Sequence, residues 1–375
     1  MKHIIFLFIT VFSSLIACTQ QMESSVKAET PEQINYTTEV VLTDVELPWG
    51  MAFLPDGGIL VTEKSGELIL FKDNLKTMIS GLPKIKVKGQ GGLLDIELHP
   101  DYATNGWIYI SYSTEEGGEG EGLNTAIMRA RLKGNSLVQQ QLIYKASPNS
   151  KKGYHFGSRI VFDNEGYLYF SIGDRGSRDE NPQDITKDGG KIYRLNADGS
   201  VPSDNPFVND ANAKTAIYSY GHRNPQGMTK HPVTGEIWTH EHGPQGGDEI
   251  NITKKGKNYG WPKISYGINY DGTTLTENTA LPNMEQPLFY WVPSIAPSGF
   301  EIVSSDKYPE WKGDLLVGSL KFQYVERLIL EENKVVKREK LFEGLGRIRS
   351  VKQAPDGYIY VGVENVGIIR IIPKK

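Results

Sequence analysis

Three features are scarce in this 375-residue sequence, and each scarcity excludes something. There is one cysteine, Cys18, so no disulfide can form within the chain. Basic residues are not in excess, because 41 Lys and Arg stand against 45 Asp and Glu, for a net charge of −4. This balance argues against a nucleic-acid-binding surface. The apolar run at residues 4–17 is shorter than the roughly 20 residues that a membrane-spanning helix needs.

The N-terminal stretch MKHIIFLFITVFSSLIAC has the pattern of an export signal, with a lysine followed by a short apolar region. Its end, LIAC, resembles a bacterial lipoprotein processing site. We therefore predict a signal peptide at residues 1–18, a lipid on Cys18, a flexible polar tether at 19–34, and an exported, periplasmic protein anchored to the outer membrane. The alternative is an ordinary secretory signal with an incidental cysteine. Membrane contact is expected only through Cys18.

The remaining chain, 35–375, repeats a short apolar stretch, a Gly-containing turn and a strand-like run of β-branched and aromatic residues. Six copies start at Met51, Ile96, Ile160, Met228, Pro309 and Val351. The pattern favours an all-β, six-bladed β-propeller in which one face of each strand is apolar. A pair of β-sandwiches or a β-helix remains open. The segment 36–47 precedes the first full copy and is expected to supply a strand that closes the last blade.

Polar, glycine-rich loops interrupt this pattern. In GQGG, the glycines after Gln90 permit close backbone approach to a ligand or form only a tight turn. In YHFGSR, His155 is a candidate general base, and Asp174 in the following GDRG is a candidate orienting carboxylate. The alternative for His155 is a structural histidine.

A second group of loops carries cations and amides. GHRNPQG supplies Arg223, Asn224 and Gln226, and later loops supply Lys321, Arg347 and Arg349. Alternation along an extended segment puts the last two arginines on one face. Gathered at one mouth, these cations would repel one another unless an anion were present. The sequence therefore predicts an anionic ligand with several carboxylates, although each charge alone is explained as a solvated surface residue.

The segment THEHGPQGGDEIN resembles a metal site at first sight, since His240, His242, Asp248 and Glu249 lie close together. Zinc is disfavoured because no HExxH-type helix follows. Hard oxygen groups suit calcium instead. The histidines are accordingly the weakest ligand candidates in this segment.

These motifs, in this order, resemble the soluble PQQ-dependent sugar dehydrogenases, and most of all the aldose sugar dehydrogenase branch of the glucose/sorbosone dehydrogenase family. The resemblance covers about residues 40–373 and rests on LPWGMAFLPDG, GQGGLLDI, HFGSR, GDRG, SYGHRNPQG, EHGPQGGDEIN, KNYGWP, SIAPSG and GRIRSV. It implies a six-bladed propeller and, as cofactor, pyrroloquinoline quinone (PQQ), a flat tricarboxylate. Tyr154 stands where the glucose-specific branch has aspartate, which favours broader aldose specificity.

The resemblance also implies residue roles. His155 is the catalytic base, with Asp174 and Arg223 as supporting catalytic residues. Residues implied to contact PQQ are Gln90, Arg223, Asn224, Gln226, Tyr270, Ser319, Leu320, Lys321, Arg347, Ile348 and Arg349. Two calcium ions are implied, one held under the quinone by the backbone carbonyls of Gly243 and Pro244, and one structural ion held by Glu249 and Tyr259 with help from Asp248.

The predicted reaction is oxidation of an aldose at C1 to a lactone, with hydride transfer to PQQ. Two alternatives from other classes are a non-catalytic carbohydrate- or protein-binding propeller, whose motifs would be degraded, and a calcium-dependent hydrolase, which would lack the cation cluster. The electron acceptor, the preferred sugar and the choice between monomer and homodimer stay open.

Overall fold

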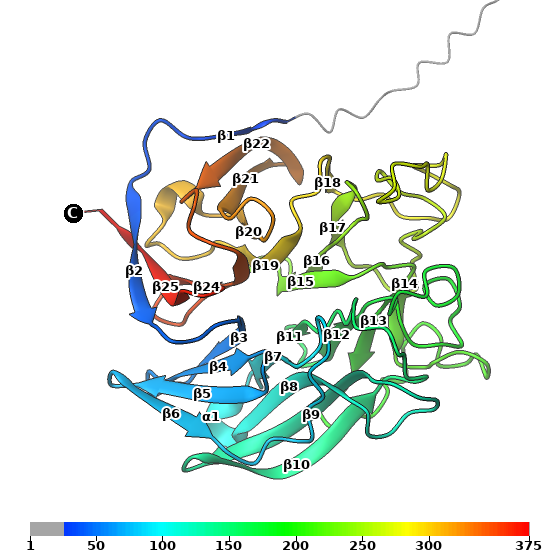
Figure 1. Ribbon diagram of the computed structural model, residues 1–375, viewed down its shortest axis with the longest axis horizontal. Helices are drawn as coiled ribbons and strands as arrows, with labels where there is room; N and C mark the ends of the chain where they lie inside the picture. Colours follow the sequence, from blue (N-terminus) through cyan, green and yellow to red (C-terminus); the bar gives the residue numbers. More distant parts are fainter. Residues whose placement is uncertain (1–25, 375) are drawn as a thin grey trace, which may run out of the picture.

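The fold is described here from a computed structural model that covers residues 26–374. Within these residues, six sheets radiate from a common centre and form a six-bladed β-propeller, which confirms the predicted fold class (Figure 1). The predicted signal peptide, the lipidation site Cys18 and residues 19–25 lie outside the described residues. No helix in 26–374 has the length and apolar character needed to cross a membrane.

Each blade is built on four antiparallel strands, which follow one another in chain order in blades 1 to 5. Blade 1 holds β3 (Pro48–Phe53), β4 (Ile59–Glu63), β5 (Glu67–Lys72) and β6 (Leu75–Ile79). Blade 2 holds β7 (Leu93–Leu98), β8 (Trp107–Thr114), β9 (Asn124–Lys133) and β10 (Ser136–Lys145), with the short helix α1 (Tyr102–Asn105) between its first two strands. Blade 3 holds β11 (Ile160–Phe162), β12 (Leu168–Ile172), β13 (Lys191–Leu195) and β14 (Ile217–Tyr220).

The second half of the chain continues the pattern. Blade 4 holds β15 (Pro225–Lys230), β16 (Ile237–Glu241), β17 (Asp248–Ile252) and β18 (Phe289–Trp291). Blade 5 holds β19 (Pro297–Ile302), β20 (Leu315–Ser319), β21 (Val325–Glu331) and β22 (Lys334–Leu341), with the 3₁₀ helix η1 (Pro309–Trp311) between its first two strands. Blade 6 holds β23 (Ile348–Gln353), β24 (Ile359–Val363), β25 (Gly367–Pro373) and, from the other end of the chain, β2 (Tyr36–Leu42).

The first strand of every blade lies innermost, and these six strands form a closed ring. β3 contacts β7, β7 contacts β11, β11 contacts β15, β15 contacts β19, β19 contacts β23, and β23 returns to β3. The six sequence repeats contain the turn and second strand of each inner hairpin, and all but the one at Pro309 begin within the first strand. Because the hairpins are antiparallel, each first strand begins, and each second strand ends, at the same face of the ring.

The ring is closed by β2, which pairs antiparallel with the C-terminal strand β25 along Tyr36 to Leu42. This confirms the closing strand expected at 36–47. The expectation of a free tether at 19–34 is wrong for its last part. Ala28–Glu29 forms β1, which pairs in parallel with β22 and adds a fifth strand to blade 5. The unpaired backbone of an edge strand favours such an addition.

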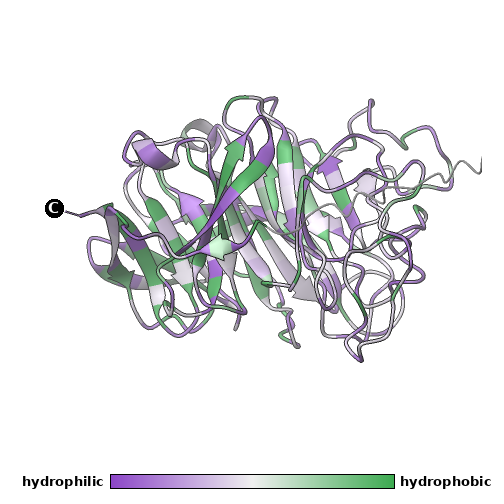
Figure 2. Cartoon of the chain, turned by 90° about the horizontal axis from the view of Figure 1, so that it is seen from above, coloured by the Kyte–Doolittle hydropathy of each residue, from purple (hydrophilic) through white to green (hydrophobic). Residues whose placement is uncertain are grey.

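The strands alternate less clearly than the sequence reading assumed, because both faces of a blade are covered by its neighbours. All five residues of β4, β12 and β24 are buried. The core is therefore divided into layers between blades, such as the one that joins Leu60 and Leu68 of blade 1 to Ile96 and Ile110 of blade 2. Figure 2 shows apolar segments concentrated in the strands and hydrophilic ones in the loops.

Candidate active site

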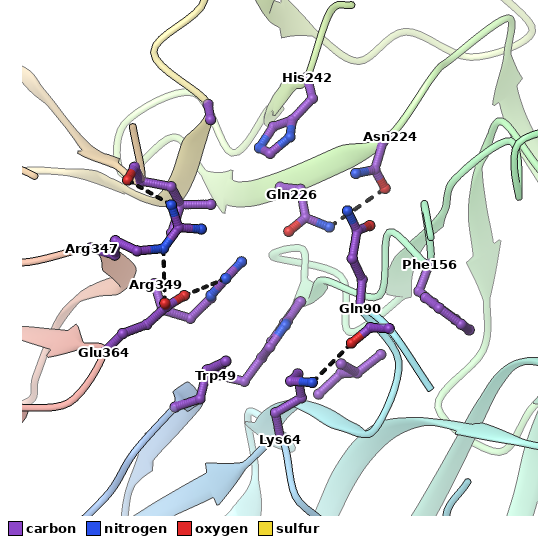
Figure 3. Close-up of a pocket in the computed structure, with 15 residues that line it drawn as sticks. Trp49, Lys64, Gln90, Phe156, Asn224, Gln226, His242, Arg347, Arg349 and Glu364 are labelled. Carbon is purple, nitrogen blue, oxygen red and sulfur yellow. Dashed lines mark hydrogen bonds and ion pairs between the residues drawn. The ribbon is translucent and has the colours of Figure 1, made fainter. Parts of the chain in front are cut away.

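A cavity of about 420 Å³ opens where the inner strands begin. Every blade contributes to its wall: Trp49 from β3, Leu94 from β7, Phe156 before β11, Asn224 and Gln226 at β15, Ala296 before β19, and Arg347 and Arg349 at β23. Four residues that directly follow second strands also line it, namely Lys64, His242, Leu320 and Glu364 (Figure 3), and Leu47, Gly89 and Gln90 complete it. Topology thus gathers at one place the polar loops that the sequence spreads over about 300 residues.

His155 is held beside this cavity in a strained backbone conformation. Its φ is +58°, the left-handed region that is unfavourable for residues with a Cβ by roughly 1–2 kcal/mol. The Gln90 side chain, on the cavity wall, accepts the His155 backbone N–H at 2.8 Å. Gln90 in turn donates its own N–H to the Gly153 carbonyl at 2.7 Å. Gln90, predicted only as a cofactor contact, therefore also fixes the loop that carries the histidine.

The imidazole of His155 pairs with Asp174, as the sequence predicted. Nδ1 lies 2.7 Å from Oδ1 of Asp174. The same oxygen accepts the Gly176 N–H at 2.6 Å, and Oδ2 accepts Nε1–H of Trp261 at 2.9 Å. The Asp174 N–H donates to the Arg223 carbonyl at 2.7 Å. The carboxylate is thus fixed from several sides and aligns the imidazole, which leaves Nε2 without a hydrogen bond within residues 26–374.

Burial sets the protonation of this pair. Desolvation lowers the pKa of His155 below its usual value, the hydrogen bond to Asp174 partly opposes this, and the Arg223 charge lowers it further. Burial raises the pKa of Asp174, but the hydrogen bond with His155 and the nearby cations outweigh burial and bring the pKa below its usual value. A neutral imidazole beside an ionised carboxylate is the state that a general base requires at neutral pH.

Arg223 and Asn224 connect the histidine loop to blade 4. Asn224 Oδ1 accepts the Gly157 N–H at 3.1 Å, two residues after His155. Arg223 donates Nη1–H to the His242 carbonyl at 3.2 Å and lies over the Trp261 ring at 5.3 Å. Its buried Nε has no partner within the described residues, and the same holds for Nε of Arg349. Such unpaired donors fit a site for an anion.

Arg347 and Arg349 do lie together, but they do not form an uncompensated cation pair. Glu364 accepts a hydrogen bond from Nε of Arg347 at 2.8 Å and another from Nη2 of Arg349. Arg347 also donates to the Leu320 carbonyl at 3.0 Å. The sequence analysis expected repulsion between these cations unless an anion were present, and Glu364, which it overlooked, is an anion that pairs with both arginines.

The other predicted cofactor contacts are placed unevenly. Leu320 lines the cavity, whereas Ser319 is buried and donates to the Ile295 carbonyl at 2.9 Å. Neither Lys321 nor Tyr270 is among the lining residues, and Tyr270 is 74% exposed in a surface turn. Ile348 is fully buried in the core layer of blade 6.

The turn at Gly243 and Pro244 is built for close backbone contacts. A Cβ on Gly243 would collide with the carbonyls of Gly246 and Gly247. Asp248 holds the turn, since its Oδ1 accepts the Gly243 N–H at 2.8 Å while Oδ2 accepts three donors at residues 294–296. These bonds occupy Asp248 in anchoring the turn, and burial raises its pKa to about 6.

Glu249 lies in a small buried pocket with Glu241, Tyr259 and Trp261. Burial and the Glu241 carboxylate raise the pKa of Glu249 above its usual value. Glu241 is paired with Nδ1 of His222 at 2.9 Å, and Asn251 donates to both carboxylates. A cation between the two carboxylates would relieve their repulsion, and calcium fits by its ligand chemistry. The Tyr259 hydroxyl is already hydrogen-bonded to the Ile252 carbonyl and the Lys254 N–H, so only its backbone oxygen is available to a metal.

Within residues 26–374, no group of three or more His, Cys, Asp or Glu side chains is arranged to hold a metal ion. A calcium ion in either place would therefore depend largely on backbone oxygens. Nε2 of His240 lies 3.1 Å from the Gly299 carbonyl, and Nε2 of His242 lies 2.7 Å from the Pro297 carbonyl. Both histidines are thus engaged in structural hydrogen bonds.

Sequence reasoning missed several residues of the cavity. Glu364 and Lys64 follow second strands that lack a recognisable motif, and Trp49 and Phe156 look like ordinary core residues. His242 was set aside as a metal ligand, yet it lines the cavity. Their position in the repeat could have identified them. Residues just after the second strand of an inner hairpin lie at the same face of the propeller as residues just before the first strand.

Fold and site together define a six-bladed propeller with a histidine–aspartate pair beside a cavity lined by cations, and comparison with known proteins gives its family. Residues 45–370 match the family model described as Glucose / Sorbosone dehydrogenase. The chain belongs to this family of sugar-oxidising oxidoreductases, which confirms the resemblance drawn from the motifs.

Several relatives align with this chain over most of their own length and over most of its length. The chain is 42% identical to Aldose sugar dehydrogenase YliI of Escherichia coli over 339 residues, covering 88% of this chain and 90% of that protein. The apo form of the soluble aldose sugar dehydrogenase from Escherichia coli superposes with a TM-score of 0.85 at 38% identity, covering 90% and 100% of the two chains. A PQQ-bound aldose sugar dehydrogenase from Streptomyces coelicolor gives 0.74 at 26% identity, covering 92% and 99%.

Proposed function

We propose that this protein oxidises aldose sugars at C1 to lactones, with PQQ as cofactor and His155 as general base. The observation that carries the proposal is the His155–Asp174 pair, held by Gln90 at the edge of a cavity whose walls bear several cations. The PQQ-bound form of a relative supports the choice of cofactor. A binding-only propeller would have no need of an aligned, neutral imidazole in a strained backbone conformation.

The chain's own residues bind, orient and move a proton. His155 takes the proton of the anomeric hydroxyl at Nε2, because Nδ1–H is directed to Asp174. The ionised Asp174 stabilises the imidazolium that results, while Arg223 adds a positive charge beside the reacting centre. The C1 hydrogen leaves with two electrons as a hydride. PQQ, when bound, supplies the acceptor for this hydride, and calcium supplies a Lewis acid for its quinone carbonyl.

Arg223, Asn224, Gln226, Arg347 and Arg349 would hold the cofactor. The carbonyls of Gly243 and Pro244 would hold the calcium ion next to it, and Glu249 would hold a structural calcium. The unpaired Nε of Arg349 on the wall of the 420 Å³ cavity fits an anionic ligand, and that of Arg223 lies in the adjoining pocket that also holds His242. The bonds to Glu364 fix Arg347 and Arg349 before any ligand arrives, which reduces the entropy cost of binding.

The test of His155 measures two quantities for each variant, namely PQQ binding and the rate of aldose oxidation with an artificial dye as electron acceptor. His155→Ala should still bind PQQ with calcium but lose about 10²–10⁴-fold in turnover with aldoses. His231→Ala, on a surface turn of blade 4, is the control and should match the unaltered protein. Full turnover by His155→Ala would refute the role of the base. Normal PQQ binding after calcium is removed with EDTA would refute the calcium bridge.

We further propose that the protein is exported, cleaved before Cys18 and anchored by a lipid on that residue. Relatives that oxidise sugars as soluble dehydrogenases are consistent with a catalytic domain held outside the membrane. Mass spectrometry of the mature N-terminus tests this, and Cys18→Ser should give a protein released from membranes. An unmodified cysteine in membrane-associated protein would contradict the anchor.

A further inference from the structure

Lys64 projects into the cofactor cavity from a rigid backbone position. It directly follows β4, and its backbone N–H donates to the Leu47 carbonyl at 3.2 Å. Its own carbonyl accepts the Leu93 N–H at 3.3 Å. Any Cβ on Gly92 would collide with that same carbonyl. The side chain therefore starts from a point fixed by two blades, and its position at the cavity is not an accident of a flexible loop.

The charge of Lys64 has no carboxylate partner within residues 26–374, in contrast to the charges of Arg347 and Arg349. Those two arginines share Glu364. Nζ of Lys64 instead donates to the Gly89 carbonyl at 2.9 Å, next to Gln90. A lysine ammonium has three N–H donors, so at least one further donor remains for a ligand. Lys64 is thus an uncompensated cation on the cavity wall.

Lys64 also lies on a different part of the wall from the arginine pair. It comes from blade 1, whereas Arg347 and Arg349 come from blade 6, and the three side chains converge on the cavity along different directions (Figure 3). A flat ligand with carboxylates on more than one edge meets cations at more than one wall. A ligand with a single carboxylate would contact only one of these two parts of the wall.

We propose that Lys64 binds a carboxylate of the anionic cofactor and so makes the cavity selective for a polycarboxylate. This inference rests on the proposed function, since it takes PQQ as the ligand. The opposing possibility is that Lys64 only caps the Gly89 carbonyl and thereby supports the Gln90 loop. The two roles of Lys64 depend on different properties of its ammonium group. Capping the Gly89 carbonyl requires a hydrogen-bond donor, whereas binding a carboxylate also requires the positive charge.

The experiment titrates PQQ into the calcium-loaded mature chain and follows binding by fluorescence quenching, without substrate. Lys64→Met should weaken binding about 10- to 100-fold, the loss expected for one hydrogen bond to a charged group. Lys64→Arg should restore most of the affinity. The matched control is Lys88→Met, because Nζ of Lys88 also bonds a backbone carbonyl, that of Lys151 at 2.7 Å, but does not line the cavity. The affinity of Lys88→Met for PQQ should equal that of the unaltered protein.

Two further measurements separate charge from support. The trimethyl ester of PQQ, which lacks the carboxylate charges, should bind Lys64→Met and the unaltered protein equally. The Tm of the apo-protein should be the same in Lys64→Met and Lys88→Met. A lowered Tm in Lys64→Met together with equal losses for PQQ and its ester would assign Lys64 to support and overturn the inference. Equal PQQ affinity in Lys64→Met would overturn it as well, whereas failure of the unaltered protein to bind PQQ would overturn the proposed function itself.

Discussion

Asp174→Asn is the most informative single change at this site, because the structure predicts its effects on both the base and the fold. Asp174 accepts hydrogen bonds through both oxygens, and each oxygen faces a different donor set. Hydrogen bonds to a charged group contribute about 1.5–3 kcal/mol. Loss of the charge removes an interaction that favours the imidazolium, so it should lower the pKa of His155 further below its usual value.

The catalytic effect of this change follows from the sign of the shift. The pKa of His155 already lies below its usual value, and Asp174→Asn lowers it further. The acid limb of the kcat/KM profile should then move to lower pH, while the plateau falls roughly 10- to 100-fold because the imidazolium is less stabilised. The direct readout is an NMR titration of the His155 imidazole in the apo-protein, which needs neither cofactor nor turnover.

The effect on stability depends on Trp261. An asparagine must direct its oxygen towards the two donors at Oδ1, so its amino group faces Nε1–H of Trp261. Two opposed buried donors cost about 1–3 kcal/mol in the free energy of unfolding. Trp261→Phe removes one of them, so the double variant should be more stable than the sum of the single changes predicts, by at least about 1 kcal/mol. Additive losses in urea unfolding, or an unshifted His155 titration in Asp174→Asn, would refute this reasoning.

Three further outcomes are expected. Calcium should raise the Tm of the chelator-treated protein, and Glu249→Gln should abolish most of this rise because it removes a buried carboxylate of the proposed structural site. Gly92→Ala should destabilise by more than about 2 kcal/mol in urea unfolding through its collision with the Lys64 carbonyl, whereas Gly153→Ala, with a nearest contact of 3.5 Å, should be tolerated. Deletion through residue 42 should prevent folding of the ring by removing β2, while deletion through 31 should not; equal circular dichroism melts for the two truncations would contradict the closing role of β2.

The propeller was predictable because its information is local. Each inner hairpin carries its own turn and strand signals, and the repeats recur at spacings that only a few architectures accommodate. Parallel addition of Ala28–Glu29 to β22 was not predictable, since it depends on an unpaired edge created by distant strands. The burial of both faces of β4 and β24 was also not predictable. A sequence shows which residues are apolar, but it does not show that a neighbouring blade covers each face of the strand.

The site was predictable only where the residues carry their chemistry in a motif. His155 lies just before the first strand of an inner hairpin and Asp174 just after its second strand, and the structure pairs them as expected. Glu364 lies in VGVENVG, which looks like an ordinary strand end, so the charge balance of the arginines could not be derived from their spacing. The glycines of GQGG show the same limit: at Gly92 the close approach is to the protein's own backbone and not to a ligand.

The distribution of the cavity wall over all six blades couples the ligand to the closure of the ring. Trp49, Phe156, Asn224 and Arg347 reach the cavity from different blades, and their relative positions exist only while β2 and β25 hold the first and last blades together. A ligand that binds this assembled wall has no comparable site on an opened chain. Ligand at 100 times its Kd therefore stabilises the closed ring by about 2.7 kcal/mol, which makes cofactor binding and ring closure one linked equilibrium.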